Sequence, residues 1–548
     1  MRLAVAKALE IFEKRIAIIT EDGGIWSYAR LAEEARAIAK SMPPAQLVVI
    51  EGNNCPATIA AYLAVLMNGG LAYFDDPRSG HALGPAFGPH IKIKCEGEAA
   101  HIEVDSDVNS ATPINPDIVI LFGTSGSTGA RKLVKITDGN ILSNTRSIIE
   151  YLGLTAEDRA ITSLKPGYAF GLSVINAQLL SGGALLLTDR LVQDTLFWSF
   201  ARANKVTILP GVPHTYEVLA KRTELDTTPS LRLLIQAGGK LRPELVCAYA
   251  RRGELSGWRF CVMYGQTEAA PRMAYLPPEL AASAPDSIGI AIPGGTLSLE
   301  DETGRLIDES EVEGELIYRG PNVMAGYALE RADLAYAVPG ERLATGDIAK
   351  RRDDGLFVIV GRISRFIKPL GYRIGLDDVE ALLAESNIVA AAVAHGEGIF
   401  IAREDGPHID ATSLASALGL PASYVTLRMV QDLPRLASGK IDYVSVGEFA
   451  GERAYLWLPS HFLCYVRETA IEAWNLLKGG DQGGDIAAYY TTALRRPVTS
   501  NDSFNSLDGD SLSYVELLIS LEETVGPLPD EWTNMTIGQL EQWNGGIL

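Results

Sequence analysis

Apolar and polar residues in the first part of the chain form runs that predict helices and strands in alternation. Residues 31–40 have the spacing of a helix, and 46–50 form a short apolar run typical of a strand. Residues 56–70 predict an amphipathic helix that ends at two glycines, and 71–77 predict a strand that runs into a turn. Such alternation is typical of layered, parallel α/β domains.

The alternation continues through the middle of the chain. Apolar runs predict strands at 117–121, 206–209 and 231–239, and helical spacing predicts helices at 139–151 and 214–221. Residues 314–322 predict a strand and turn of a small β subdomain. Residues 377–383 predict an N-capped helix whose acidic first turn suits the helix dipole.

Length and composition indicate how many domains to expect and whether the protein is globular. At 548 residues the chain is long enough for about three or four domains. Its 47% hydrophobic and 21% charged residues are typical of a soluble globular protein. A net charge of −20 argues against nucleic acid as a partner, although local dipoles and a few cations still allow a bound nucleotide.

Cysteine usage and hydropathy bear on the compartment. Five cysteines lie far apart without a CxxC pair, so we expect neither a disulfide framework nor a zinc site. The charged N-terminal segment lacks the features of a signal peptide, and no window is apolar enough to span a bilayer. We therefore expect a protein of the reducing cytoplasm.

A loop rich in glycine and hydroxyl side chains follows the strand predicted at 117–121. Residues 122–132, FGTSGSTGARK, hold three glycines, four hydroxyl side chains and two cations. Glycines let backbone amides approach a phosphate, hydroxyls donate to its oxygens, and Lys132 adds a charge-assisted bond worth about 1.5–3 kcal/mol. The loop has no Gly-Lys pair and is therefore not a Walker loop. A flexible, solvated loop is the alternative.

The TSGSTG segment at 124–129, together with Lys132, resembles the signature loop of the adenylate-forming superfamily. This superfamily includes acyl-CoA synthetases, firefly luciferase and the adenylation domains of peptide synthetases. Arg131 stands here for a usual proline and Leu133 for a usual glycine. The resemblance implies ATP as a substrate and phosphate binding by Thr124, Ser125, Gly126, Ser127, Thr128, Gly129 and Lys132.

Two further segments resemble nucleotide-binding motifs of the superfamily. Residues 263–268, MYGQTE, match at every fixed position and imply that Tyr264 flanks the adenine, Thr267 binds the AMP phosphate and Glu268 holds Mg²⁺. A carboxylate is a ligand that such a hard cation prefers. The strand predicted at 231–239 has an end that lets a flat base lie against the backbone, at Ala237, Gly238 and Gly239.

Later motifs imply the remaining nucleotide contacts and a moving domain. Asp347, in a Thr-Gly-Asp turn, is the carboxylate that would accept both ribose hydroxyls, and Arg362 would contact the nucleotide. Ser364 occupies the hinge position, where Asp or Lys is usual. The resemblance further implies that a pantetheine thiol enters past Gly371.

Residues 433–442 match the last motif of the superfamily and put Lys440 on a mobile turn. Lysines on turns are usually only solvated. By resemblance, Lys440 would bridge the substrate carboxylate and the α-phosphate while the new bond forms, which is electrostatic stabilisation of the transition state.

The segment 165–173 corresponds to the start of the superfamily's acyl pocket. CoA ligases often have a histidine at the position of Tyr168, and amino-acid activators have an aspartate at the position of Gly171. Without that aspartate, a buried ammonium group would cost several kcal/mol. We therefore favour a fatty, hydroxy or aromatic acid over an α-amino acid and expect His214 to lie near the pocket as well. The alternative is that Tyr168 and Phe170 are core aromatics.

The C-terminal part resembles an acyl or peptidyl carrier domain. A polar linker at 479–484 precedes a segment, 502–512, that contains Leu-Asp-Gly-Asp-Ser-Leu, in which Asp508 replaces the usual glycine. The resemblance implies 4'-phosphopantetheine on Ser511. A serine that caps a helix is the alternative.

These resemblances imply four segments. We expect a large adenylation domain at 1–361, built of layered α/β subdomains with a small β-barrel-like subdomain, and a small mobile α+β domain at 362–446. A linker at 447–483 and an all-α helical-bundle carrier domain at 484–548 should follow.

The predicted function is activation of a carboxylic acid as its acyl adenylate with ATP and Mg²⁺, then transfer to a phosphopantetheine thiol. The implied partners are a small carboxylic acid, a phosphopantetheinyl transferase, and a partner carrier or downstream acyl-transfer protein, with no nucleic acid and no membrane span. One alternative is an acyl-CoA synthetase that uses free CoA. Another is a degenerate adenylate-binding scaffold, suggested by Arg131, Leu133 and Ser364.

Overall fold

The chain divides into two compact units, Met1–Arg453 and Ala454–Leu548. The computed structural model describes residues 1–75, 83–88, 90–105, 108, 112–123, 132–338, 340–367, 369, 374–396, 398–407, 409–418, 420–435, 440–451, 499, 503 and 535–541. Most of the linker and carrier domain predicted at 447–548 thus lies outside the described residues, where only α15 (Ile537–Glu541) is a helix with defined bounds. The predicted boundary at 361 stays a prediction.

The largest sheet of the first unit has a parallel centre. Strands β1, β10, β9, β11, β12 and β13 run parallel, and antiparallel strands pair at both edges. The order across this sheet, within the described residues, is β15 (Ile290–Ala291), β14 (Arg272–Leu276), β13 (Arg259–Gly265), β12 (Leu233–Gln236), β11 (Ile208–Gly211), β9 (Arg159–Thr162), β10 (Ala184–Leu187), β1 (Ile16–Thr20) and β2 (Ile25–Ser27).

A second mixed sheet carries the strand that precedes the Gly/Ser loop. Its parallel centre is formed by β7, β4, β3 and β5. The order, again for the described part of the chain, is β19 (Tyr327–Ala328), β8 (Leu133–Thr137), β7 (Ile118–Gly123), β4 (Leu71–Asp75), β3 (Leu47–Glu51), β5 (Ile91–Glu96) and β6 (Ala99–Val104). The expected parallel α/β layers are therefore present.

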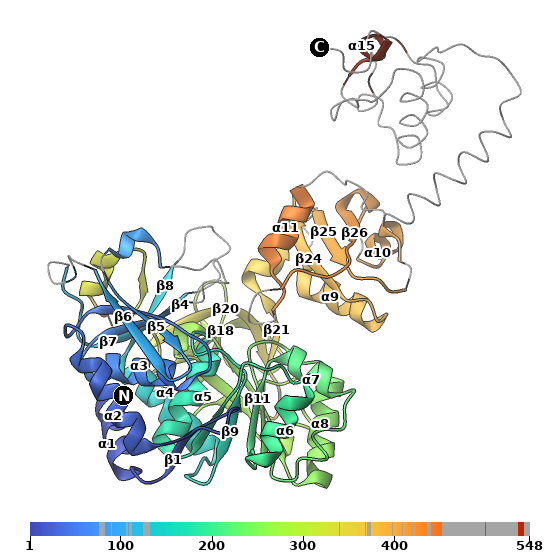
Figure 1. Ribbon diagram of the computed structural model, residues 1–548. Helices are drawn as coiled ribbons and strands as arrows, with labels where there is room; N and C mark the ends of the chain where they lie inside the picture. Colours follow the sequence, from blue (N-terminus) through green and yellow to red (C-terminus); the bar gives the residue numbers. More distant parts are fainter. Residues whose placement is uncertain are drawn as a thin grey trace, which may run out of the picture. The chain divides into compact units, whose positions relative to one another are not determined.

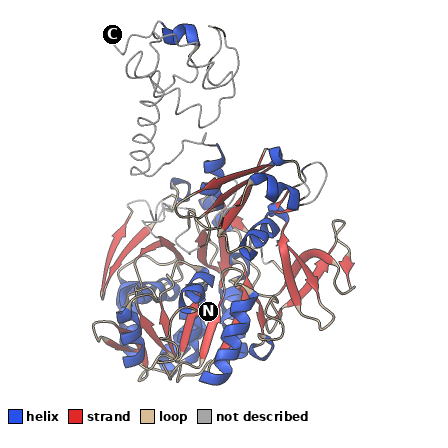
Figure 2. Ribbon diagram, turned by 90° about the vertical axis from the view of Figure 1, so that its right-hand side faces the viewer, coloured by secondary structure: helices blue, strands red, loops and turns tan. Residues whose placement is uncertain are grey.

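Helices fill the space between these two sheets and cover the outer face of the first (Figures 1 and 2). Helices α3 and α4 contact the second sheet, α5 contacts β9 and β10 of the first, and α7 and α8 contact β11 and β13. The bounds are α1 (Arg2–Ile11), α2 (Tyr28–Lys40), α3 (Pro56–Met67), α4 (Asp138–Leu152), α5 (Ala169–Ser181), α6 (Thr195–Ala203), α7 (Pro213–Leu219) and α8 (Pro243–Ser256).

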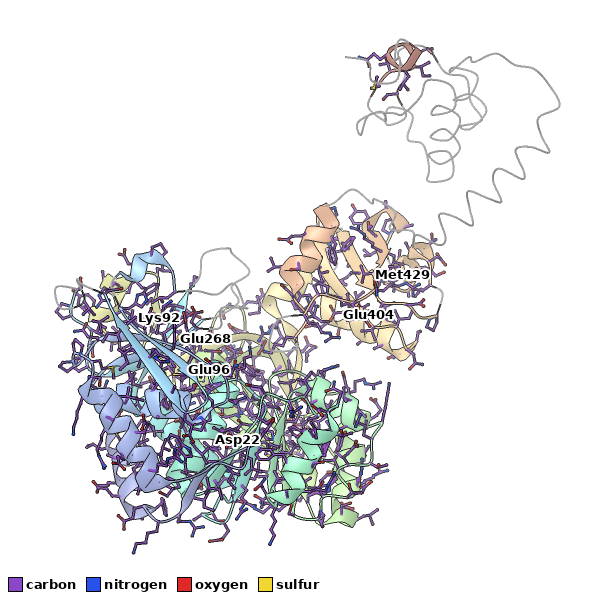
Figure 3. The ribbon with its side chains drawn as sticks, in the orientation of Figure 1. Asp22, Lys92, Glu96, Glu268, Glu404 and Met429 are labelled. Atoms are coloured by element: carbon purple, nitrogen blue, oxygen red, sulfur yellow. The ribbon has the colours of Figure 1, made fainter. Side chains whose placement is uncertain are left out.

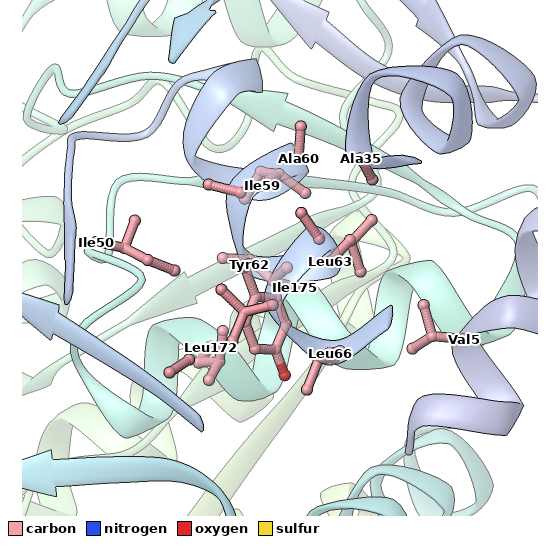
Figure 4. Close-up of a cluster of buried hydrophobic side chains, with 14 of the residues drawn as sticks. Val5, Ala35, Ile50, Ile59, Ala60, Tyr62, Leu63, Leu66, Leu172 and Ile175 are labelled. Carbon is pink, nitrogen blue, oxygen red and sulfur yellow. The ribbon is translucent and has the colours of Figure 1, made fainter. Parts of the chain in front are cut away.

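Helix α3 is the centre of the main core and corrects one prediction. Every residue of 56–66 is buried, so the helix is not amphipathic as predicted. Figure 4 shows Tyr62, Leu63 and Leu66 of α3 beside Leu172 and Ile175 of α5. A helix apolar all round needs partners on every side, and here α1, α2, α5 and the second sheet provide them.

Local sequence signals explain where the middle helices begin and end. Thr137 and Asn140 form a reciprocal capping box at the start of α4, and Gly153 ends the helix at φ 61°. The later helix α9 (Leu376–Glu385) begins differently from the prediction at 377–383. Its N-cap is Gly375, without a side-chain cap, while Asp377 and Asp378 do lie in the first turn.

A smaller antiparallel sheet follows and carries Asp347 and Arg362. Among the described residues its order is β17 (Leu306–Ile307), β16 (Thr296–Glu300), β18 (Glu313–Arg319), β20 (Arg342–Arg351) and β21 (Phe357–Arg362). This is the β subdomain predicted around 314–322, in the form of a five-stranded sheet.

The last part of the first unit is a small α+β domain. The strands β22 (Phe366–Ile367) and β23 (Ile374–Gly375) form a short ribbon. A three-stranded sheet follows, flanked by helices: β24 (Ala390–His395), β25 (Gly398–Arg403), β26 (Val425–Met429), α9, α10 (Ala411–Ala417) and α11 (Tyr443–Gly451). It has its own core, which includes Val379, Leu383 and Ile401.

Substitution of Leu63 by alanine tests the packing of α3. Leu63 is 0% exposed, so its loss leaves a cavity between α3 and its neighbours and lowers the free energy of unfolding by about 2–5 kcal/mol. Chemical denaturation followed by tryptophan fluorescence measures this change.

The matched control is Leu255→Ala on α8, where the side chain is 91% exposed. This control changes the free energy of unfolding by no more than about 0.5 kcal/mol. Equal losses for the two variants would show that α3 is not packed as described.

Candidate functional site

A buried carboxylate on β20 is the centre of the candidate site. Asp347 is 2% exposed and pairs across the sheet with Arg362 of β21, whose Nε donates to Asp347 Oδ1 at 2.6 Å. The Tyr264 hydroxyl donates to Oδ2, and Gln266 Nε2 lies 3.2 Å from the same oxygen. Tyr264 of the predicted 263–268 motif and the predicted nucleotide contact Arg362 therefore meet at the carboxylate of Asp347.

Burial explains the electrostatics of this group. Desolvation raises the pKa of Tyr264 well above its ordinary value, and the negative charge of Asp347 raises it further. Desolvation disfavours the charge of Arg362, but Asp347 outweighs this effect, so the pKa of Arg362 is raised overall. Tyr264 thus stays a neutral donor and Arg362 a cation.

Glu268 lies in the short helix η4 (Thr267–Ala269), directly after the strand β13 (Figure 3). The Tyr327 hydroxyl of β19 donates to Glu268 Oε1 at 3.0 Å. Lys132 Nζ lies 5.6 Å from the centroid of the same tyrosine ring. Tyr327 therefore connects the end of the Gly/Ser loop to the carboxylate that was predicted to hold Mg²⁺.

Glu268 is the carboxylate for which a metal role was predicted. Within the described residues, no group of three or more Asp, Glu, His or Cys side chains could hold a metal by itself. Mg²⁺ commonly takes one or two carboxylates and completes its shell with water and phosphate oxygens. Glu268 is suited to this kind of shared coordination.

Lys440 lies in the small domain, shortly before helix α11. It is solvent-accessible and precedes Ile441, which forms a β-bridge with Arg435. The surrounding protein lowers the pKa of Lys440 by desolvation, and Arg362 acts in the same direction. The negative charges of Asp347 and Glu268 oppose this lowering of the pKa.

An ion-pair network that the sequence analysis missed anchors the segment after Lys440. Arg365 Nη2 lies 2.6 Å from Glu380 Oε1, and the Tyr443 hydroxyl donates to Glu380 Oε2 at 3.0 Å. The Arg365 guanidinium also lies 3.9 Å from the Tyr443 ring centroid. Because these residues come from η7 (Ile363–Arg365), α9 and α11, only the fold reveals the network. It ties the predicted hinge segment to the turn of Lys440.

The glycine-rich end of β12 lies beside the predicted acyl pocket. Gly238 has φ +90°, and a Cβ on it would clash with the Tyr168 hydroxyl, so the two residues are in contact. Ala237 is buried, and the side-chain amide of Gln236 donates to the carbonyl of Gly239 at 2.9 Å. Tyr168 is the N-cap of α5 and packs edge-on against Phe170, with ring centroids 6.2 Å apart.

Two further residues were predicted to lie in this pocket, Gly171 and His214. A Cβ on Gly171 would clash with the carbonyl of Lys165, so in this backbone no side chain fits at the position where amino-acid activators have aspartate. His214 on α7 is half-exposed, with Nδ1 3.7 Å from Glu217 Oε2. Its assignment to the pocket stays a prediction.

Several predicted site residues lie outside the described residues. These are the loop residues Thr124, Ser125, Gly126, Ser127, Thr128 and Gly129, together with Gly371 and Ser511. Ser364 lies in η7, next to Arg365. Leu133, which departs from the superfamily loop, is a buried residue of β8 that pairs with Gly123 and so belongs to the core.

A comparison with protein families finds one match. Residues 87–328 match the model of the family described as "AMP-binding enzyme". This range begins before the Gly/Ser loop and ends after β19, so it contains Lys132, Tyr264, Glu268 and Tyr327. Within the described residues, no helix is both long and apolar enough to cross a membrane.

Curated relatives include a phenyloxazoline synthase and a CoA synthase. Phenyloxazoline synthase MbtB of Mycobacterium sp. (strain MCS) is 28% identical over 556 residues, which cover 91% of this chain and 45% of the synthase. Feruloyl-CoA synthase of Amycolatopsis sp is 28% identical over 361 residues, covering 63% of this chain and 72% of that enzyme. This chain thus spans less than half of the length of the mycobacterial relative.

Solved structures share the fold. O-succinylbenzoate Coenzyme A Synthetase (MenE) from Bacillus subtilis, in complex with AMP, has a TM-score of 0.63 at 21% identity and covers 80% of this chain and 96% of its own. ATP-bound MatB from Rhodopseudomonas palustris has a TM-score of 0.65 at 20% identity, and the match covers 82% of this chain and 98% of MatB. Residues 87–328 are thus similar to AMP-binding enzymes, and the fold of the chain is similar to that of two solved enzymes that bind AMP or ATP.

Proposed function

We propose that the chain activates a fatty, hydroxy or aryl acid with ATP as its acyl adenylate and then transfers the acyl group to a thiol. The observation that carries this proposal is the contact of Tyr264 and Arg362 with the buried carboxylate of Asp347. Glu268 follows Tyr264 by four residues, and the charges of Asp347 and Glu268 both act on the pKa of Lys440. A nucleotide needs acceptors for its ribose and cations for its phosphates, and this group contains both.

The ribose and base are assigned to the buried side of the site. Asp347 accepts the two ribose hydroxyls, with Arg362 beside it to balance the carboxylate charge. Tyr264 flanks the adenine, while Ala237, Gly238 and Gly239 form the backbone surface against which the base lies. A flat surface of this kind requires positions without bulky side chains, which Ala237 and the two glycines satisfy.

The phosphates are assigned to the side of Glu268 and Lys132. Thr267 binds the α-phosphate, and residues 124–129 with Lys132 hold the β- and γ-phosphates. Mg²⁺, when bound at Glu268, neutralises phosphate charge and orients the leaving group. The contact between Tyr327 and Glu268 supports this assignment because it fixes the carboxylate on the side of Lys132.

Lys440 acts in the first half-reaction. A carboxylate oxygen of the acid attacks the α-phosphorus, the bond from this phosphorus to the bridging oxygen breaks, and pyrophosphate leaves. The Lys440 ammonium group stabilises the negative charge that develops on the attacked phosphate.

The second half-reaction requires Lys440 to leave so that a thiol can reach the acyl adenylate. We assign the hinge to Ser364 and the path of the thiol to Gly371. The neighbouring contacts of Arg365 with Glu380 and Tyr443 support a domain that moves as one body, since they hold the hinge segment and the turn of Lys440 together. Rotation of this kind separates two reactions in one pocket.

The preferred thiol is that of 4'-phosphopantetheine on Ser511, in this chain or in a partner carrier. Support comes from the carrier-like motif and from the relatives. Nonribosomal peptide synthetase gliP of Aspergillus fumigatus is 26% identical over an alignment that covers 94% of this chain, so the alignment must extend beyond residue 446. Free CoA is the alternative acceptor, as the names of the CoA ligase relatives suggest.

Removal of the Lys440 side chain tests the first half-reaction. Lys440→Ala should slow acid-dependent pyrophosphate release by about 10²–10³-fold, because one preorganised charge is lost from the transition state. The exposed Lys221→Ala is the control and leaves the rate unchanged. Equal, background-level release from wild type and the Lys440 variant would support the scaffold alternative instead.

The lowered pKa of Lys440 adds a pH signature to this test. Because only the charged lysine stabilises the transition state, the rate falls as the pH rises through a pKa that lies below the ordinary lysine value of 10.5. Lys440→Arg stays charged and moves this fall to higher pH. An unchanged basic limb in the arginine variant would contradict the role of Lys440.

Asp347→Asn tests the ribose site. The substitution keeps the shape of the side chain but removes its charge, so the KM for ATP should rise by about 10–100-fold, as expected for a lost charge-assisted hydrogen bond. Asp308→Asn, on an exposed turn of the same subdomain, is the control. Initial rates of pyrophosphate release at varied ATP measure the effect, and an unchanged KM would exclude ribose binding by Asp347.

Intact-mass spectrometry tests the acceptor. After treatment with a phosphopantetheinyl transferase and CoA, wild type should gain mass on Ser511 and gain the acyl mass only when ATP and the acid are present. Ser511→Ala gains neither. Formation of acyl-CoA without any ATP-dependent mass gain on Ser511 would favour the CoA ligase alternative.

A further inference from the structure

Arg272, the first residue of β14, is a buried cation that the proposed mechanism does not use. It is 4% exposed, and its Nε has no hydrogen-bond partner among the described residues. The groups that act on its pKa are Tyr151, which also forms a hydrogen bond with the Arg272 side chain, Tyr168 and Cys261, and none of these is a carboxylate. A buried arginine without an anion is unusual because desolvation of its charge is costly.

The backbone at Arg272 is held firmly in place. The side-chain amides of Asn144 and Asn322 both donate to the carbonyl of Arg272, at 2.8 and 2.9 Å. Arg272 also pairs with Gly265 across β13 and β14. A Cβ on Gly265 would clash with the backbone of the residue before Arg272, so the two strands approach closely here. The arginine is therefore presented by a rigid support directly beside the 263–268 motif.

The Arg272 side chain lines a narrow cavity next to the predicted acyl pocket. Its Cζ lies 4.2 Å from the centroid of Phe170, the residue that packs against Tyr168. The other walls come from α4, α5 and strands β11–β13 and are mostly apolar: Ile148, Leu152, Val174, Ala177, Ile208 and Ile235. Ser173 adds a hydroxyl to this lining. Arg272 is thus the charged residue in the lining of a mostly apolar cavity.

We propose that Arg272 binds a second carboxylate of the substrate, so that the preferred acid is a dicarboxylic acid. One carboxylate is activated at Lys440 and the other pairs with Arg272. A guanidinium matches a carboxylate in a bidentate manner, and the cation without an anion in the free protein gains its partner from the ligand. This inference rests on the proposed acid-activating function and specifies its substrate class.

Binding of such a group requires the cavity to widen. In the free protein it measures about 10 Å³, which is room for roughly one water molecule. Entry of a carboxylate therefore displaces apolar side chains of α4 or α5, while the anchored backbone of Arg272 stays in place. The stacking of Arg272 on Phe170 links this movement to Tyr168 at the edge of the pocket.

The test is ATP–pyrophosphate exchange with matched pairs of substrates. Aliphatic and aromatic dicarboxylic acids are each compared with their monomethyl esters, which keep one carboxylate and nearly the same shape. Wild type should prefer the best dicarboxylic acid over its ester by about 10²-fold or more in kcat/KM, as expected when a site built for a polar group meets an analogue that lacks it. Arg272→Met should bring this ratio close to one.

Controls separate recognition from folding. Arg251→Met on the exposed face of α8 should keep the wild-type ratio. The best dicarboxylic acid should raise the thermal midpoint of wild type but not of Arg272→Met, because only the arginine gives the second carboxylate a partner. Without ligand, the midpoint of Arg272→Met should be equal to or above that of wild type, since an unpaired buried charge is removed.

Two results would overturn the inference while leaving the proposed function intact. One is exchange with monoacids and esters at rates equal to those of dicarboxylic acids. The other is an Arg272→Met protein that keeps the preference but has a lower thermal midpoint, which would make Arg272 a structural partner of Phe170. Exchange with no acid at all would instead reject the proposed function, and the inference with it.

Discussion

The buried carboxylate of Asp347 is the constraint on which the rest of the site depends. A charge at 2% exposure is stable only if hydrogen bonds and an opposite charge replace water. Arg362, Tyr264 and Gln266 supply them, and they come from two different sheets. The need to satisfy one carboxylate therefore fixes the small antiparallel sheet against the end of β13.

The arrangement of the large sheet explains why distant motifs meet. Strands β12 and β13 are parallel neighbours, so the glycines after β12 and the 263–268 segment at the end of β13 emerge at the same edge. Binding sites of open α/β sheets lie at this edge, where strands end and helices begin. Tyr327 extends the site to the second sheet by contacting Glu268 near Lys132.

The acyl side of the site shows how packing limits chemistry. Gly171 is held against the carbonyl of Lys165, so the absence of an aspartate there follows from the backbone and not only from the choice of side chain. The narrow cavity beside α5 has Arg272 of β14 in its lining, with the guanidinium over the ring of Phe170. An enzyme that keeps an unpaired buried charge gives up stability, which is common where a ligand supplies the missing partner.

Much of the fold and part of the site could be predicted from the sequence. Short apolar runs marked strands such as β3, β7 and β11, and the motif spacing marked Tyr264, Glu268, Asp347, Arg362 and Lys440, because turns, glycines and charges leave local signals. Tyr264 and Arg362 do contact Asp347, while the assignment of these five residues to one site stays a prediction.

Only the tertiary structure decided the burial of α3 and the network of Arg365, Glu380 and Tyr443. It also decided that Nε of the buried Arg272 has no hydrogen-bond partner among the described residues. The spacing of residues along the chain shows which positions are apolar, but not how many sides of a helix are covered. Likewise, a single arginine in an apolar strand does not reveal whether an anion lies beside it. Those properties depend on contacts between residues far apart in sequence, and they exist only once the sheets and helices have packed.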